Sequence, residues 1–393
     1  MSLPPAFREV PRRVAWLRGL LLAACFGTMV ASFPLWTNSR LFPVLPIAAW
    51  FPILPAPWDI AAFIMVLAAL VAACRWYREA VTTFLIASAL LVMGDQSRLQ
   101  PWFYMYWVML LLTLSPGPSA VTTCRLALSA VYVWSGIQKF NHDFYAQVAP
   151  WFVQPATSWL PEWMMSPLHA VVASAPIVEL LIGLGLWTRW TRLPALVAAV
   201  AVHVMALVFL GPLGHRQNWI IWPWNAVMPL LAWTLFPPKA AREEGAGRRP
   251  QLWAAAVAGL FALLPLLSFF GRWDSYLSFC LYSGHLTMAD LFVSAELREK
   301  LPPVVRGFTP RTPEPYNRQL QGEYVVRVDL WSTSVLKVPP LPEARNYRNI
   351  ARWMAGMASD PNEVRLVVSP RVGPTLFYRG SDLRPEAGIS LDR

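Results

Sequence analysis

The sequence predicts an all-α polytopic membrane bundle of about nine transmembrane helices, followed by a small extracytoplasmic α+β domain. Composition indicates the membrane class, because 56% of the 393 residues are hydrophobic and 14% are charged, whereas soluble domains carry about a quarter charged residues. Charge is sparse before Phe270 and ordinary after it. We therefore expect the helical bundle over residues 1–270, a connector over 271–313 and the α+β domain over 314–393.

Apolar runs near the length of about 20 residues that a span requires recur along the first two-thirds of the chain. The third, fourth and eighth runs are short, so they are either tilted spans or partly re-entrant segments. In order, the runs are Ala15–Trp36, Asp59–Trp76, Ala80–Met93, Trp102–Leu114, Ala120–Phe140, Leu168–Trp187, Leu193–Leu210, Ile220–Phe236 and Trp253–Phe270.

The basic residues between these runs predict an orientation, because cytoplasmic loops carry an excess of arginine and lysine. One side receives Arg8, Arg12, Arg13, Arg18, Arg75, Arg78, Arg125, Arg189, Arg192, Lys239, Arg242, Arg248 and Arg249. The short loops of the other side hold only Arg40, Arg98, Lys139 and Arg216. This asymmetry places the N-terminus in the cytoplasm of a bacterial inner membrane and the segment after Phe270 outside.

The pattern after Phe270 changes to that of a small soluble domain. Tyr324–Leu330 alternates as a half-buried strand, and Val364–Val368 and Thr375–Tyr378 are predicted to be further strands. Apolar residues at helical spacing predict a helix over Pro342–Ser359.

Charge and cysteine content exclude several classes of partner and cofactor. Most of the net charge of +11 sits in short loops, where it meets anionic lipid headgroups, so membrane lipid rather than nucleic acid is the expected partner. The four cysteines are scattered without a metal-ligand spacing or a disulfide framework, and no metal is predicted.

Tryptophan is unusually frequent, with 21 residues in the chain. An interfacial belt at the headgroup level accounts for such an enrichment. The alternative is an aromatic vestibule that admits a lipid-soluble ligand from the outer leaflet.

Two ionisable residues fall in the middle of predicted spans, Glu179 in the sixth and His203 in the seventh. Counted from the outer ends, both lie roughly 12–17 Å deep at 1.5 Å per residue. A carboxylate and an imidazole at one depth can share a proton, which lowers the penalty of burying each. The alternative is a hydrogen bond that only locates the two helices.

A second polar group is predicted at the outer boundary, where ligand pockets commonly form between helix ends. Its candidate ligand-binding residues come from several loops and are interleaved with tryptophans. They are Asp95, Arg98, Gln100, Trp102, Gln138, His142, Asp143, His215, Arg216, Asn218, Trp222 and Asn225.

Lys139, at the end of the fifth run, is the sharpest single candidate. A lysine at a helix end ordinarily extends its ammonium to the headgroups. A lysine held among aromatic side chains instead loses solvation, which lowers its pKa and turns it into a usable general base.

The tract around this lysine supports a family resemblance. Val131-Tyr-Val-Trp-Ser-Gly136-Ile-Gln-Lys139-Phe-Asn-His-Asp143-Phe resembles the tract with the catalytic lysine of vitamin K-dependent gamma-carboxylase, which also marks the bacterial HTTM (horizontally transferred transmembrane) group. The likeness covers residues 10–290. DoxX-like quinone-associated membrane proteins end helices in a similar Ser-Gly-x-x-Lys-Phe.

The resemblance implies a specific chemistry at Lys139. In the carboxylase, the lysine deprotonates a reduced naphthoquinone, oxygen adds, and the resulting base removes a proton from a glutamate γ-carbon before carbon dioxide adds. This chain departs from the family in carrying only a small domain where the enzyme has a large luminal region. It also shows no match to the enzyme's other catalytic histidine.

Three functions follow from these observations. The first is a quinol-using oxygenase or epoxidase of the carboxylase type, with Lys139 as the base. The second is a DoxX-like accessory subunit that holds a quinone or a membrane or extracytoplasmic protein partner. The third is a proton-coupled transporter that uses Glu179 and His203, although the sequence shows no inverted repeat.

Overall fold

A computed structural model describes residues 10–216, 219–238, 250–313 and 323–383. The chain forms two compact units. Unit 1 comprises Met1–Ala31, Ile64–Ser88 and Gln100–His285, and unit 2 comprises Ser32–Phe63, Ala89–Leu99 and Leu286–Arg393. Unit 2 therefore combines the loop after the first helix with the C-terminal domain.

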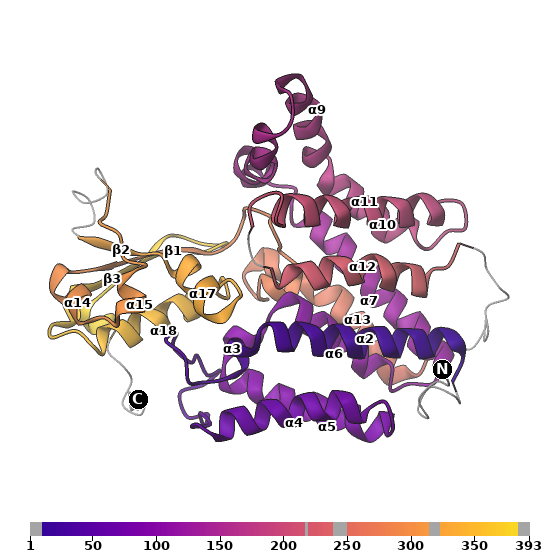
Figure 1. The fold of residues 1–393 in the computed structure, drawn as a ribbon, viewed down its shortest axis with the longest axis horizontal. Coiled ribbons are helices and arrows are strands. Elements are labelled where there is room, and N and C mark those ends of the chain that lie inside the picture. Colours follow the sequence, from indigo (N-terminus) through magenta and orange to yellow (C-terminus); the bar gives the residue numbers. More distant parts are fainter. Residues whose placement is uncertain (1–9, 217–218, 239–249, 314–322, 384–393) are drawn as a thin grey trace. The chain divides into compact units, whose positions relative to one another are not determined.

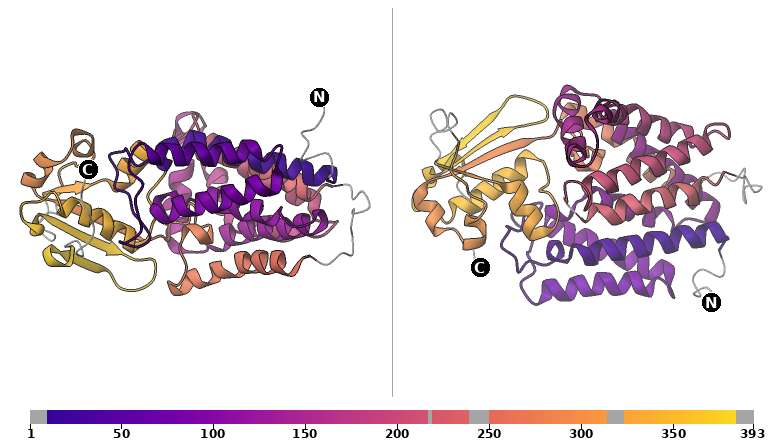
Figure 2. Two further views of the ribbon diagram at one scale, coloured as in Figure 1. Left: turned by 90° about the horizontal axis from the view of Figure 1, so that it is seen from below. Right: turned by 45° about the horizontal axis from the view of Figure 1, so that its top comes forward.

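Unit 1 is a bundle of apolar helices that run beside one another in both views of Figure 2. Its long helices, labelled in Figure 1, are α2 (Arg12–Ala31), α7 (Gly117–Ile137), α11 (Arg192–Leu210), α12 (Ile221–Leu235) and α13 (Leu252–Leu263). Shorter helices complete it: α6 (Pro101–Leu112), α8 (Ala149–Val153), α9 (Glu162–Ala173) and α10 (Ala175–Gly185). The helices α4 (Trp58–Ala72) and α5 (Tyr77–Gly94) contribute residues to both units.

The number of membrane spans differs from the sequence-based expectation. Every predicted span contains a helix, but among the described residues only five helices are long and apolar enough to cross a membrane. They are Arg12–Ala31, Tyr77–Gly94, Gly117–Ile137, Arg192–Leu210 and Leu252–Phe270, and a bent pair would make a sixth. Trp58–Ala72 and Pro101–Leu112 are apolar but shorter. The nine spans are therefore not confirmed.

The predicted sixth span is broken in the middle. The helices α9 and α10 meet at Ser174 with a bend of 46°. Pro176 explains the break, because its ring removes a backbone donor and clashes with the preceding turn. The half of this run that carries Glu179 thus begins a new helix directly after the bend.

Glycines allow α7 and α10 to approach more closely than any other residue would. A Cβ added to Gly136 would lie 2.6 Å from the Pro176 carbonyl oxygen and 2.8 Å from the Leu180 nitrogen. From the other helix, a Cβ on Gly183 would lie 2.8 Å from the Ser129 carbonyl oxygen. Small residues at a contact let backbones come together, which is the main source of helix association in lipid.

We predict that Gly136→Ala destabilises unit 1 by about 1–3 kcal/mol, because the added methyl group must push the α10 backbone away. Gly19→Ala in α2 is the matched control, since a Cβ there meets nothing within 4 Å. Thermal unfolding of the purified protein in detergent measures both changes. Equal midpoints for the two variants would contradict the close-contact account.

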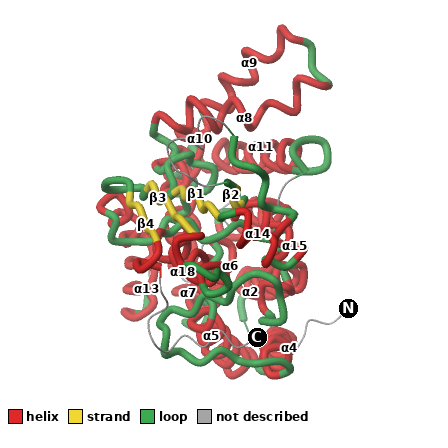
Figure 3. The backbone as a smooth tube through the Cα atoms, turned by 90° about the vertical axis from the view of Figure 1, so that its left-hand side faces the viewer, coloured by secondary structure: helices red, strands yellow, loops and turns green. Residues whose placement is uncertain are grey.

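Unit 2 contains a four-stranded antiparallel sheet in the order β2-β1-β3-β4, drawn in yellow in Figure 3. The strands are β1 (Met288–Val293), β2 (Tyr324–Val326), β3 (Val364–Ser369) and β4 (Leu376–Arg379). The helix α18 (Ala344–Ala355) packs against β3 and β1, and its apolar face buries Ile350 and Met354. Within its described residues, unit 2 also contains the α-helices α3 (Phe33–Trp36), α14 (Ala295–Lys300), α15 (Pro303–Arg306) and α17 (Val328–Leu336).

The sequence located most of this sheet but misassigned two segments. β3, β4 and α18 lie where periodicity predicted them. The predicted strand Tyr324–Leu330 ends at Val326, because Val328 begins α17. The expected connector 271–313 contains β1, which pairs with both β2 and β3. Its uninterrupted apolar end, Leu291–Val293, lacks the alternation that marked the other strands.

Candidate functional site

A buried ion pair joins α10 to the end of α7. The Lys139 Nζ lies 2.8 Å from Glu179 Oε2, and the two side chains are 7% and 12% exposed. The same ammonium donates to the Ser135 carbonyl oxygen at 2.9 Å and to the Ser135 hydroxyl oxygen at 2.8 Å. All three N–H bonds of the ammonium are therefore satisfied inside the protein.

Helical spacing on both helices builds this pair. Tyr132, Gly136 and Lys139 follow one another at intervals of four and three residues, so they share one face of α7 and its C-terminal turn. Glu179 and Gly183 share a face of α10 for the same reason. The glycines bring these faces together, so the charged groups meet where the backbones are closest.

A second chain of hydrogen bonds begins on the same face of α7 and crosses to α11 and α12. The Tyr132 hydroxyl lies 2.9 Å from His203 Nε2, and His203 Nδ1 lies 2.8 Å from Asn225 Oδ1. Asn225 Nδ2 donates to the Ile221 carbonyl oxygen, so its Oδ1 is free to accept from the imidazole. His203 Nδ1 therefore donates to Asn225 Oδ1. In the neutral ring, Nε2 then accepts a hydrogen bond from the Tyr132 hydroxyl.

Glu179 and His203, which the sequence placed at one depth, have different direct partners in the structure. Glu179 contacts Lys139, and His203 contacts Tyr132 and Asn225. Tyr132 and Lys139 nevertheless lie seven residues apart on α7 and its C-terminal turn, so both sets of contacts begin on one helix face. We call Tyr132, Lys139, Glu179, His203 and Asn225 the polar centre.

The polar centre combines hydrogen-bond donors and titratable groups inside an apolar bundle. Removal from water strengthens electrostatic interactions, so each group depends strongly on its partner. An arrangement of this kind can hold a polar ligand group or pass a proton between neighbours. Lys139 can act as a base only if its ammonium first transfers a proton to one of the groups that it contacts.

The residues on either side of Lys139 are bound to the segment 268–285. Gln138 Nε2 donates to the Ser268 hydroxyl oxygen at 3.0 Å, and Asn141 Nδ2 donates to the Ser283 carbonyl oxygen at 2.9 Å. Asp143 lies 3.6 Å from both His142 and His285, measured to each Nδ1. His142 and Asp143 are exposed, so these two predicted residues form a surface group at the bundle end.

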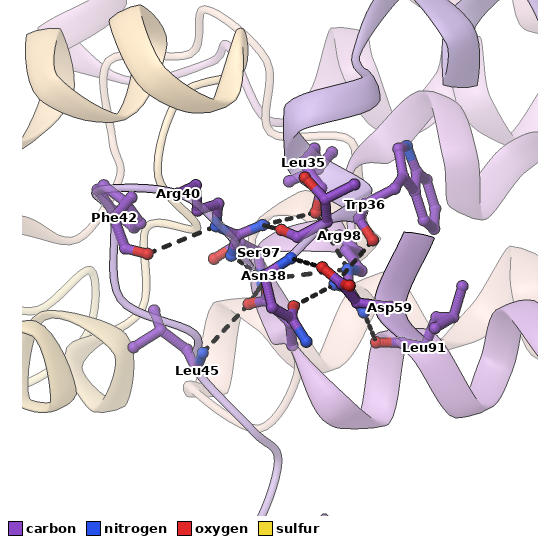
Figure 4. Close-up of polar contacts among 12 residues, drawn as sticks. Leu35, Trp36, Asn38, Arg40, Phe42, Leu45, Asp59, Leu91, Ser97 and Arg98 are labelled. Atoms are coloured by element: carbon purple, nitrogen blue, oxygen red, sulfur yellow. Dashed lines mark hydrogen bonds and ion pairs between the residues drawn. The ribbon is translucent and has the colours of Figure 1, made fainter. Parts of the chain in front are cut away.

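Asp95 and Arg98 belong to a buried network in unit 2 (Figure 4). The Asp95 carboxylate pairs with Arg40 and accepts from the Ser97 and Leu45 backbone nitrogens. Arg98 donates to backbone carbonyl oxygens at the ends of α3 and α5 and to the Asn38 side chain at 2.7 Å. Burial is the main cause that lowers the Arg98 pKa to about 10, against the opposing effect of Asp95. These contacts fix the loop between α3 and α4.

The other predicted ligand residues are distributed through unit 1. Gln100 and Trp102 are buried at the start of α6, and Trp222 lies in α12. His215 and Arg216 line an open cavity after α11, whereas Asn218 lies outside the described residues. The predicted outer residues therefore have different direct partners: Asp95 and Arg98 bond within unit 2, and Asn225 pairs with His203 within unit 1.

Several important partners were missed by the sequence analysis. Tyr132 and Ser135 stand at positions i−7 and i−4 from Lys139, and that helical spacing could have identified them. Arg40 and His285 carried no such signal, because each reaches its carboxylate partner across more than fifty residues of chain.

Comparison with known families matches a segment that contains four of the five residues of the polar centre, all except Asn225. Residues 117–218 match the family model of methylamine utilisation protein MauE. The match begins at the first residue of α7 and includes α10 and α11, but it covers only about a quarter of the 393 residues. No curated protein and no solved structure matches the chain.

This match overturns the resemblance to the HTTM group and to gamma-carboxylase. The tract that suggested it, residues 131–144, lies within the MauE segment, and no HTTM domain matches. A helix that ends in small residues, lysine and an aromatic residue occurs in more than one kind of membrane protein, so that short pattern was not specific.

We predict that Asp95→Asn destabilises unit 2 by about 3 kcal/mol, because it removes the carboxylate between two buried arginines. Glu299→Gln is the control, since its exposed pair with Arg306 contributes less than about 1 kcal/mol. Chemical unfolding followed by circular dichroism compares the variants. An effect of Asp95→Asn no larger than that of the control would show that the network is not stabilising.

Proposed function

We propose that this protein is a membrane-integral accessory component of a redox system, acting through binding rather than through its own catalysis. The supporting observation is the MauE match, which spans α7, α10 and α11 and so contains most of the polar centre. Methylamine utilisation is the process that the matched family's name gives, and a related amine-oxidising system is the proposed setting. Lys139 supports a binding role, because its three N–H bonds hold neighbouring groups together.

The proposed ligand is a lipid-soluble quinone, with a naphthoquinone as the first candidate. A quinone presents two carbonyl oxygens that only accept hydrogen bonds, so a site within an apolar bundle must supply donors. Tyr132 and Lys139 are the two donors of the polar centre proposed to bind the quinone, whose carbonyl oxygen would replace Ser135 as an acceptor of the ammonium. Membrane lipid and a membrane or extracytoplasmic protein are the further proposed partners.

The proposed location is the bacterial inner membrane, with the N-terminus in the cytoplasm and unit 2 outside. The asymmetry of the arginines and lysines supports it, although Arg8, Lys239, Arg242, Arg248 and Arg249 lie outside the described residues.

Titration of the detergent-purified chain with a short-chain naphthoquinone tests the proposal, because bound quinone quenches nearby tryptophans. Trp134 and Trp187 lie on the helices of the polar centre or at their ends. We expect Tyr132→Phe and the charge-free pair Lys139→Met with Glu179→Met each to weaken binding about tenfold, which corresponds to about 1.4 kcal/mol.

Tyr77→Phe is the matched control, because it removes a buried hydroxyl that bonds Thr113 elsewhere in unit 1. It should leave quinone affinity unchanged. Equal affinity in all variants would mean that the quinone only partitions into the detergent, and would contradict the proposed site.

A proton pathway is the second candidate function. The observation that favours it is the proximity of the Lys139–Glu179 pair to the Tyr132–His203–Asn225 chain. In this case His203→Gln would abolish proton uptake into proteoliposomes while leaving quinone affinity intact, so the two functions are distinguishable.

A further inference from the structure

An open cavity of about 440 Å³ lies between two segments of unit 1 that the polar centre does not use. One wall is the 3₁₀ helix η3 (Gln154–Ser158), and the other is the turn that follows α11. Polar groups dominate its lining, and among its nine described lining residues Arg216 alone has a permanent charge. Because none of those nine residues carries a carboxylate, the electrostatic character of the described lining is that of an anion site.

The local structure holds the basic groups in place. Arg216 adopts a left-handed backbone conformation with φ of 52°, and its Nε donates to the Pro212 carbonyl oxygen at 3.3 Å. That bond directs the guanidinium back toward the segment 212–216. The two terminal nitrogens of the guanidinium remain as donors. Such a conformation is uncommon for a residue with a side chain and is typical of functional turns.

His215 lies in the turn that follows α11 and also lines the cavity. Its ring stacks on Trp151 with centroids 4.0 Å apart and an interplanar angle of 14°. Its Nε2 lies 2.8 Å from the Trp151 carbonyl oxygen, which can only accept, so Nε2 carries a proton. The backbone nitrogen of His215 also donates to the Phe209 carbonyl oxygen, which anchors the turn to the end of α11.

The position of the cavity relates it to the lipid surface. The helix α11 is long and apolar enough to cross a membrane, and the cavity begins directly after its last residue, Leu210. Large apolar side chains are exposed beside it: Leu213 is 71% exposed, Trp159 48% and Trp219 46%. Exposed tryptophans at the end of a span mark the headgroup level.

We propose that this cavity binds the phosphate of an anionic phospholipid headgroup, with Arg216 and Gln154 as the donors. The apolar rim would accommodate the start of the acyl chains. The shared chemistry is a phosphate group, so a free phosphate ion is the alternative source. This site is independent of the quinone proposal, because none of its residues belongs to the polar centre.

Native mass spectrometry of the full chain with added phosphatidylglycerol tests the proposal. We expect Arg216→Gln to lower lipid affinity about fivefold, the factor that corresponds to about 1 kcal/mol for one basic residue at a lipid surface. Arg216→Lys, which keeps the charge but loses the fork of donors, should retain most of the affinity. Arg189→Gln is the matched control, because Arg189 is another exposed arginine beside an exposed tryptophan, Trp190.

A parallel titration with sodium phosphate distinguishes the two sources. If binding of phosphatidylglycerol depends on Arg216, the cavity is a lipid site. If only the binding of inorganic phosphate depends on Arg216, the cavity binds the free ion and the lipid proposal is overturned. Equal lipid affinities for Arg216→Gln and Arg189→Gln, with no binding of phosphate, would overturn the site altogether.

Discussion

The close approach of α7 and α10 is the constraint on which the polar centre depends. Gly136 and Gly183 allow the two backbones to approach closely, and the charged side chains one turn away then meet. In lipid, apolar side chains gain little by leaving the solvent for one another, so close packing and interhelical hydrogen bonds hold such helices together. The break at Ser174 contributes as well, because it starts α10 as a separate helix that can adjust to α7.

The ion pair and the histidine chain have different physical roles. Desolvation makes a buried ion pair a weak source of net stability, but removing one partner leaves an uncompensated charge and is strongly unfavourable. Lys139 and Glu179 therefore specify one packing of the two helices more than they stabilise it. Tyr132, His203 and Asn225 are neutral and hydrogen-bonded in sequence, which ties α7 to α11 and α12 without charge separation. Four of these five residues lie in the segment matched by the MauE family, so that segment carries most of the polar centre.

The sequence predicted helices and strands better than it predicted which side chains contact one another. Each apolar run contains a helix of the bundle, although α8 lies between two runs, and alternation located β3 and β4, because these patterns are local. The sequence predicted that Glu179 is buried, but it did not predict the bond to Lys139. That bond depends on a helix break and on two glycines, and their joint effect is not apparent in any single apolar run. Asp95 and Arg98 were selected because polar residues lie beside tryptophans at the predicted outer helix ends, whereas in the structure they bond to one another and to the loop between α3 and α4. The short motif around Lys139 suggested the wrong family because it covers only one helix end, whereas the MauE match covers residues 117–218.

A double-mutant cycle on Lys139→Met and Glu179→Met tests the central claim most directly, with the free energy of unfolding in detergent as the measurement. If the two groups are specific partners inside the bundle, each single substitution destabilises by about 3 kcal/mol or more. The double variant, which leaves no unpaired charge, should then be less destabilised than either single variant. Because the two single effects sum to about 6 kcal/mol or more, this result corresponds to a coupling energy of at least about 3 kcal/mol. Effects that add to within about 0.5 kcal/mol would show that the lysine and the glutamate act independently, and would contradict the account.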